Sequence, residues 1–120
     1  MSAVRIVVVA VLVAFAAAAA AQADSPPVGP LPAGPKATLS TRAGELVAIA
    51  LPKRSGGRVW RIARAFDGTI VKQVSEADVG SSVVLVFKAL HPGTVRLAFA
   101  LTRGETTKAL DARTFEVRIR

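Results

Sequence analysis

Residues 83–101 read VVLVFKALHPGTVRLAFAL, two apolar runs separated by a short group of turn residues. The first run, VVLVFKA, is apolar on both faces, which is typical of a strand at the centre of a sheet. In the second run Val95, Leu97, Phe99 and Leu101 occupy alternate positions, so we expect them to point into a core. HPGT between the runs is a turn sequence. The stretch therefore predicts two consecutive strands of an all-β domain.

The same period of two continues on both sides of this stretch. ELVAIAL, residues 45–51, alternates large apolar residues with small alanines, and RVWRIARAF, residues 58–66, places Trp60 and Ile62 on one face. The last strand, ARTFEVRIR, has its apolar face at Phe115, Val117 and Ile119. We predict an all-β, immunoglobulin-like antiparallel β-sandwich of about seven strands, with a barrel as the alternative.

Two polar stretches predict how these strands are connected. Asp67-Gly68 is a tight-turn signal between RVWRIARAF and TIVKQV, and it predicts a hairpin at that point. Residues 75–82, SEADVGSS, are polar and break the alternation, so we expect a loop there.

The N-terminal part predicts export. Arg5 is followed by an unbroken apolar run, and Ala21-Gln22-Ala23 has the small-x-small pattern of a cleavage site, so residues 1–23 are expected to be a signal peptide cleaved near Ala23. A single-pass anchor is the alternative. The Pro-rich residues 24–36 are expected to be a tether of undetermined order, and residues 37–120 the β-sandwich domain. Export, together with the absence of cysteine, favours a bacterial protein that is periplasmic or secreted.

Composition narrows the classes of function. The chain has no cysteine, which excludes a disulfide scaffold, an N-terminal lipoprotein and a thiol enzyme. With 16 Lys and Arg against 8 Asp and Glu, it is basic, which favours anionic partners. Aromatic residues do not interleave with the basic ones on an exposed face, so we expect no specific nucleic-acid binding.

Candidate catalytic groups are sparse. His91 lies in a turn with no evident partner, so a structural or exposed role is expected. The carboxylates are scattered, and the nearest pair, Glu76 and Asp78, offers too few ligands for zinc or calcium. We expect no enzyme activity, no metal and no cofactor.

LPKRSGGRVW, residues 51–60, combines a glycine pair with basic residues and the single tryptophan of the chain. Gly56 and Gly57 do not form a phosphate loop, because the following Lys-Ser or Lys-Thr and the helix are missing. We expect a turn followed by a core tryptophan; a tryptophan at a binding rim, stacked on arginines, is the alternative.

Three stretches in this order resemble the chagasin family of cysteine-peptidase inhibitors over most of residues 37–120. They are GELVAIALP with the glycine loop and Trp60 that follow it, VVLVFKALHPGTVRLAFAL, and DARTFEVRI. The resemblance implies an immunoglobulin-like sandwich that lays three loops across the cleft of a papain-like cysteine peptidase. KRSGG stands where the family has its Asn-Pro-Thr-Thr-Gly loop, residues 75–82 where it has a glycine-rich loop, and residues 102–108 where it has an Arg-Pro-aromatic loop. The implied inhibitory residues are Pro52, Lys53, Arg54, Ser55, Gly56, Gly57, Trp60, Gly80, Thr102 and Arg103.

Two functions follow from these observations. The first is an exported inhibitor of papain-like cysteine peptidases, expected to be a monomer. The alternative is a basic, envelope-associated module that keeps the fold, lacks inhibition and binds an anionic surface.

Overall fold

The computed structural model of the chain describes residues 27–120, in which every regular element is a strand. The strands are β1 (Lys36–Thr41), β2 (Leu46–Pro52), β3 (Arg58–Ile62), β4 (Val71–Val79), β5 (Ser82–Ala89), β6 (Gly93–Arg103) and β7 (Asp111–Ile119). No helix of residues 27–120 is long and apolar enough to cross a membrane. The expected signal peptide and its cleavage site near Ala23 lie outside the described residues.

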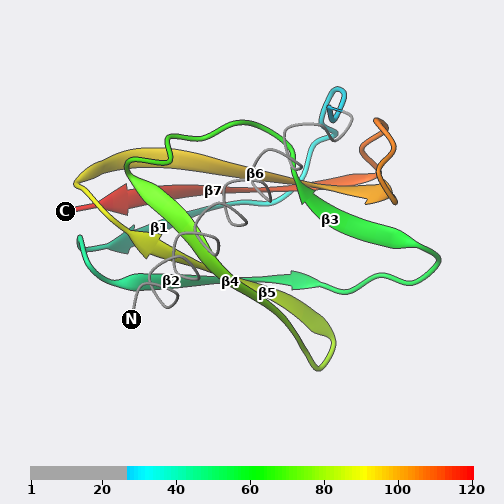
Figure 1. The fold of residues 1–120 in the computed structure, drawn as a ribbon. Helices are drawn as coiled ribbons and strands as arrows, with labels where there is room; N and C mark the ends of the chain where they lie inside the picture. Colours follow the sequence, from blue (N-terminus) through cyan, green and yellow to red (C-terminus); the bar gives the residue numbers. More distant parts are fainter. Residues whose placement is uncertain (1–26) are drawn as a thin grey trace, which may run out of the picture.

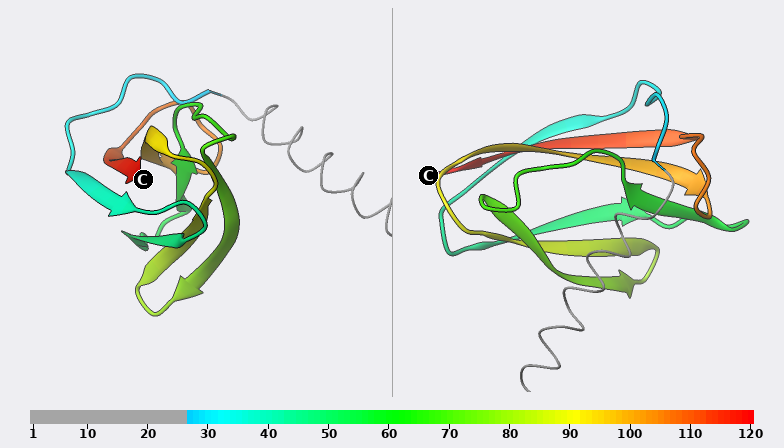
Figure 2. Two further views of the ribbon diagram at one scale, coloured as in Figure 1. Left: turned by 90° about the vertical axis from the view of Figure 1, so that its left-hand side faces the viewer. Right: turned by 45° about the horizontal axis from the view of Figure 1, so that its top comes forward.

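The strands form two sheets that lie face to face as separate layers (Figures 1 and 2). One sheet has the order β1-β7-β6-β3 and the other the order β2-β5-β4, so β5 is central, as its apolar faces predict. This confirms the predicted immunoglobulin-like sandwich of seven strands. One pairing departs from a purely antiparallel arrangement, because β1 lies parallel to β7. Parallel neighbours need a long crossover between them, and here the intervening chain, which includes the second sheet, supplies it.

The core lies between the sheets and contains the residues that alternation placed inward. Leu97 and Phe99 of β6 and Val117 of β7 are each 1% exposed, and they meet Ile49 of β2 and Phe87 of β5 from the other sheet. Phe66, Phe87, Phe99 and Phe115 form a continuous series of tilted or edge-to-face contacts, with ring centroids 5.9–6.3 Å apart. Each such pair adds about 0.5–1.5 kcal/mol beyond its area burial. Packing of this kind holds together a small domain that has no disulfide.

The hairpin predicted at Asp67-Gly68 is wrong. Asp67 does begin a turn, in which the Thr69 amide donates to its Oδ1 at 2.9 Å. However, β3 pairs with β6 and β4 pairs with β5, so the segment between them crosses from one sheet to the other. Phe66 and Ile70 on this crossing pack against the core, and a tight hairpin would leave them outside it.

The loop predicted over residues 75–82 is also wrong. β4 continues to Val79 and β5 begins at Ser82, so the connection is only Gly80 and Ser81. Residues 75–79 are exposed, which explains their polar composition, but their backbones pair with β5. β4 is an edge strand, where few side chains need to be apolar, and an irregularity at Val74 interrupts its ladder.

Residues 27–35, which we call the strap, lie against the domain and lead into β1 (Figure 2). Val28 is only 8% exposed, and the carbonyl of Pro35 accepts a hydrogen bond from the Thr114 amide at 3.1 Å. Gly34 lies directly on β7: a side-chain carbon at this position would come 2.1 Å from the carbonyl oxygen of Ala112. Close contact between the strap and the sheet therefore requires glycine at position 34.

Candidate functional site

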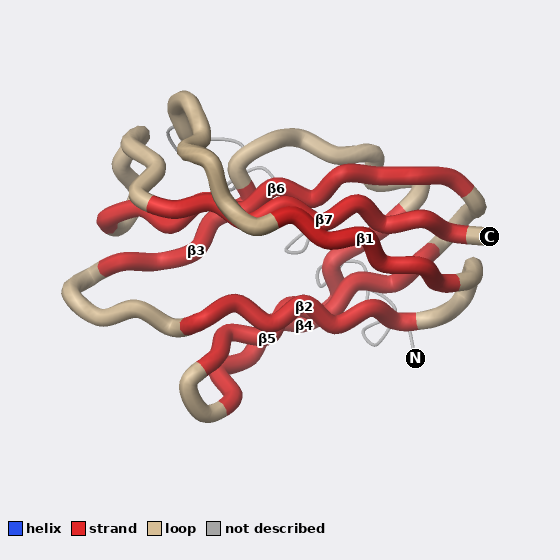
Figure 3. The backbone as a smooth tube through the Cα atoms, turned by 180° about the vertical axis from the view of Figure 1, so that it is seen from behind, coloured by secondary structure: helices blue, strands red, loops and turns tan. Residues whose placement is uncertain are grey.

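Three connections lie at the same end of the sandwich, which we call the loop end. The first loop is residues 53–57 between β2 and β3, the second turn is Gly80 and Ser81 between β4 and β5, and the third loop is residues 104–110 between β6 and β7. Figure 3 shows the first loop reaching furthest along the long axis, with the second turn set back and to one side. The end is therefore a projecting ridge with a lateral flank.

The first loop owes its shape to its glycines. Pro52 ends β2, and Gly56 and Gly57 follow with φ angles of +76° and +73°, a region that residues with a Cβ rarely adopt. The Arg58 Nε donates to the carbonyl of Ser55 at 2.7 Å across the turn. The turn predicted from the glycine pair is present, and its backbone is held by a side chain from the strand that follows it.

Trp60 combines the two roles considered from the sequence. Its ring is half-buried and packs against the core. The indole Nε1 donates to the carbonyl of Pro52 at 2.8 Å, which fixes the start of the first loop to β3. The guanidinium of Arg113 lies 5.5 Å from the ring centroid, an arrangement that favours cation–π attraction. Trp60 thus supports the loop from beneath rather than forming its tip.

Backbone hydrogen bonds join the first loop to both of its neighbours. The Lys53 amide donates to the carbonyl of Ser81 at 2.9 Å, and the Gly104 amide donates to the carbonyl of Gly57, also at 2.9 Å. An ion pair between Lys53 Nζ and Asp78 Oδ2, at 3.2 Å, adds to the first contact, although both side chains are well exposed and the pair contributes little. The three connections therefore form one bonded unit.

The third loop is supported from within and from the side. Thr102, expected to be a contact residue, is fully buried, and its hydroxyl donates to the carbonyl of Gly104 at 2.6 Å. Arg61 of β3 donates to the carbonyl of Thr106 at 2.7 Å. Thr102 therefore holds the loop in place, whereas the neighbouring Arg103 is exposed and available to a partner.

The strap reaches the same loop. The Gly29 amide donates to the carbonyl of Thr107 at 2.7 Å. Arg64, just after β3, donates to the carbonyls of Val28 at 3.1 Å and Gly29 at 3.0 Å. The strap thus braces the third loop, a relationship that no local sequence signal indicates.

The sequence did not identify Val79 as a site residue. It precedes Gly80 at the tip of β4 and is 59% exposed, one of the largest apolar exposures in the described part of the chain. A bulky apolar residue beside a turn glycine is the signal that could have found it. Leu110, 40% exposed at the end of the third loop, is a second apolar contact candidate at this end.

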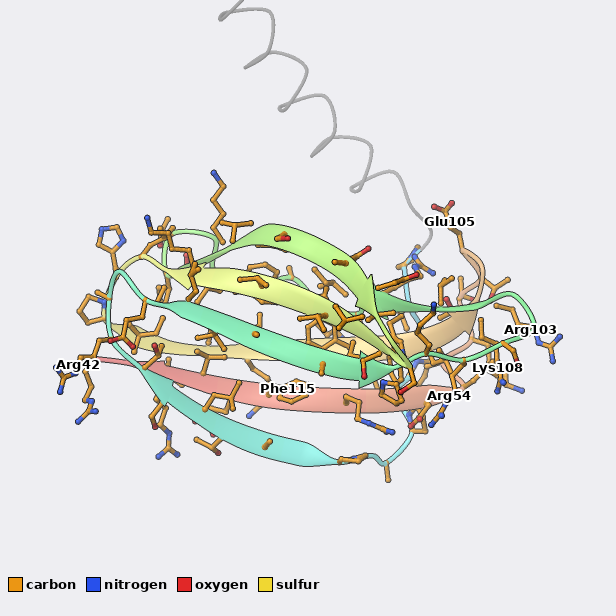
Figure 4. All side chains as sticks on the ribbon, turned by 90° about the horizontal axis from the view of Figure 1, so that it is seen from below. Arg42, Arg54, Arg103, Glu105, Lys108 and Phe115 are labelled. Carbon is orange, nitrogen blue, oxygen red and sulfur yellow. The ribbon has the colours of Figure 1, made fainter. Side chains whose placement is uncertain are left out.

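The loop end is strongly basic. Its cations are Lys53, Arg54, Arg58, Arg103 and Lys108, and its carboxylates are Asp78, Glu105 and Asp111, the last of which is bonded to Arg113. Figure 4 shows Arg54, Arg103 and Lys108 together at this end and Arg42 at the opposite one. Asp78 is paired with Lys53 and Asp111 with Arg113, and the cations outnumber the carboxylates, so the local field is positive.

Within residues 27–120, the single histidine lies far from the loop end. His91 is exposed at the other end, where its Nδ1 lies 2.7 Å from the carbonyl of Thr69, a structural contact of the kind expected. Residues 27–120 contain no group of three or more His, Asp or Glu placed to hold a metal ion. The Thr69 hydroxyl, and then its amide, lower the pKa of Asp67 through hydrogen bonds to the carboxylate, which makes Asp67 a turn-stabilising anion.

Comparison with solved structures identifies the architecture. The cysteine protease inhibitor EhICP2 from Entamoeba histolytica superposes with a TM-score of 0.56 over 74% of this chain and 99% of that chain, at 20% sequence identity. The chain has the fold of a cysteine protease inhibitor. PbICP-C, solved in complex with falcipain-2, gives a TM-score of 0.57 over 80% of this chain and 98% of that chain, at 14% identity.

No family model and no curated protein sequence matches the chain. Both of these structures share the sandwich of this chain, so the resemblance to the chagasin family drawn from the sequence is confirmed at the level of the fold.

Proposed function

We propose that the domain inhibits papain-like cysteine peptidases by placing its loop end across the active-site cleft. The observation that carries this proposal is the bonding of three connections into one unit through Lys53–Ser81 and Gly57–Gly104. Loops that are ordered before binding lose little conformational freedom when they bind, so more of the contact energy appears as affinity. Occurrence of the same fold in EhICP2 and in PbICP-C bound to falcipain-2 supports the proposal.

The contact residues proposed here differ from those implied by the family resemblance at Trp60, Val79 and Thr102. Arg54, Ser55 and the glycine pair form the projecting first loop, and Arg103 flanks it. Thr102 and Trp60 act from beneath, as positioning residues. Val79 supplies an apolar contact on the lateral flank, where an exposed side chain loses water on binding.

In this proposal the loop end blocks a peptidase and catalyses no reaction itself. The three loops offer threonine and serine hydroxyls but no histidine or cysteine, and His91 lies at the opposite end. Blocking a cleft needs shape and contact only, which is what this end provides.

Export is part of the proposal and has its own test. The signal-peptide pattern ends at Ala23, so mass spectrometry of the protein released by cells is expected to give an N-terminus at Asp24. An intact Met1 on the released protein would contradict it.

Inhibition is tested with the chain from Asp24 onward, which contains every described residue. Its inhibition constant is measured against papain and a cathepsin-L-like enzyme, together with the variants Val79→Ala and Val74→Ala. Both valines are exposed on β4, at 59% and 48%, but only Val79 is at the tip. Val79→Ala is expected to raise the inhibition constant about fivefold, since it removes two methyl groups whose burial against the peptidase contributes about 1 kcal/mol, and Val74→Ala to leave it unchanged. No inhibition at micromolar concentration would refute the proposal for these enzymes.

A further inference from the structure

Three cations at the loop end have no partner within the domain. Arg54, Arg103 and Lys108 are exposed, and no group among residues 27–120 forms a hydrogen bond or ion pair with their side chains. Two other arginines of the domain do have partners: Arg64 holds the strap, and Arg113 bonds to Asp111 at 2.9 Å and lies over Trp60.

The three cations lie on segments that a backbone hydrogen bond joins. Arg54 belongs to the first loop, Arg103 ends β6 and Lys108 lies in the third loop, and the Gly57–Gly104 hydrogen bond joins the two loops. Their positive charge is therefore displayed in one place, at the end proposed to meet the peptidase (Figure 4). Of the carboxylates at this end, Asp78 is paired with Lys53 and Asp111 with Arg113, whereas no ion pair within residues 27–120 involves Glu105.

Clustered like charges repel one another and stabilise nothing inside the domain. They are favourable only when a partner supplies negative charge at matching positions. Complementary potentials of this kind mainly raise the rate of association and exclude wrongly charged partners.

We infer that the loop end selects cysteine peptidases whose active-site cleft is flanked by carboxylates. Arg54, Arg103 and Lys108 steer and pair with those carboxylates, while the uncharged backbone at Gly56 and Gly57 enters between them. This inference rests on the proposed inhibition and specifies which members of the target class are inhibited.

The experiment compares two papain-like peptidases, one with an acidic rim around its cleft and one with a neutral rim. Association and dissociation rates are measured at low and high salt for the unmodified chain, for Arg54→Ala/Arg103→Ala/Lys108→Ala, and for Arg42→Ala. Arg42 is the matched control, an exposed arginine at the opposite end.

For the acidic-rimmed enzyme we expect the triple variant to associate about tenfold more slowly at low salt, with a smaller effect on dissociation, and the difference to shrink at high salt. Arg42→Ala is expected to behave as the unmodified chain, and the neutral-rimmed enzyme to be insensitive to the triple substitution.

Two results overturn the inference and leave inhibition standing: equal, salt-independent association with both enzymes, or a triple variant that associates with both enzymes as the unmodified chain does. After the second result, retention of the unmodified chain but not of the triple variant on a heparin column would assign the cations to an anionic surface instead. If the unmodified chain inhibits neither enzyme, the proposed function fails and the inference fails with it.

Discussion

The Gly104 amide donates a hydrogen bond to the carbonyl of Gly57 at 2.9 Å, which joins the first loop to the third. Both residues have φ angles in the left-handed region, +73° at Gly57 and +52° at Gly104. The contact therefore depends on two backbone conformations that glycine adopts at little cost. The bond between the first and third loops therefore rests on glycine at both positions.

Gly57→Ala is expected to destabilise the domain. The space around a Cβ at this position is open, so the effect comes from backbone strain alone, about 1–2 kcal/mol. For a domain of this size each kcal/mol lowers the thermal midpoint by about 4–8 °C. Gly68→Ala is the matched control, because its surroundings are equally open and its φ is not left-handed. Equal midpoints for the two variants would show that Gly57 is not conformationally required.

Trp60→Phe tests the support of the first loop. The substitution removes the indole N–H that reaches the Pro52 carbonyl at 2.8 Å and weakens the contact with Arg113. We expect a loss of about 1–2 kcal/mol in the free energy of unfolding, measured by urea denaturation. Val59→Ala, on the neighbouring residue with 45% of its side chain exposed, should cost much less. A phenylalanine variant as stable as the unmodified chain would show that the hydrogen bond from Trp60 to Pro52 contributes nothing to the free energy of unfolding.

Arg64→Ala is expected to release the strap. Without its hydrogen bonds to the Val28 and Gly29 carbonyls, the strap keeps the Gly29–Thr107 bond at one end and the Pro35–Thr114 bond at the other. Hydrogen exchange of the Gly29 amide should therefore become faster, because local opening of that bond costs less. Arg42→Ala should leave it unchanged. Unaltered exchange in the Arg64 variant would show that the strap is held by other contacts.

Acid should weaken the turn at Asp67. Hydrogen bonds from Thr69 lower the pKa of Asp67 in the folded state, so its stabilising effect is fully present above the pKa of the unfolded chain. That effect is lost as the pH falls through the lower, folded-state pKa.

Thr69→Ala removes the hydroxyl and keeps the amide, so NMR titration should show the pKa of Asp67 moving back towards its ordinary value. Thr94→Ala, at an exposed threonine of β6, is the control. An Asp67 pKa that is the same in both variants would exclude the hydroxyl as its main cause.

The strands were predictable because period-two alternation reports burial directly. Leu97, Phe99 and Leu101 are nearly inaccessible, as their spacing requires. Local sequence does not determine which strands pair with one another. Asp67-Gly68 is a local turn signal, whereas burial of Phe66 decides that the chain crosses to the other sheet. The polar residues 75–79 predicted a loop where the structure has a strand, because an edge strand needs few apolar side chains.

The site was predictable only in part. Gly56 and Gly57 predict the turn of the first loop, and the resemblance to chagasin-type inhibitors indicates where the other two connections of the site lie. The bonds from Gly57 to Gly104 and from Gly29 to Thr107 join residues far apart in the chain, and no local pattern encodes them. Burial of Thr102 and exposure of Val79 likewise depend on the packed fold.

The most direct test of the central claim is a hydrogen-exchange footprint of the chain with and without an inhibited papain-like peptidase. We expect new protection at residues 53–57 and 104–110, with weaker protection at Gly80 and Ser81, and no change at the opposite end around Arg42 and His91. Protection centred on that opposite end, or on the open edge of β4, would contradict it.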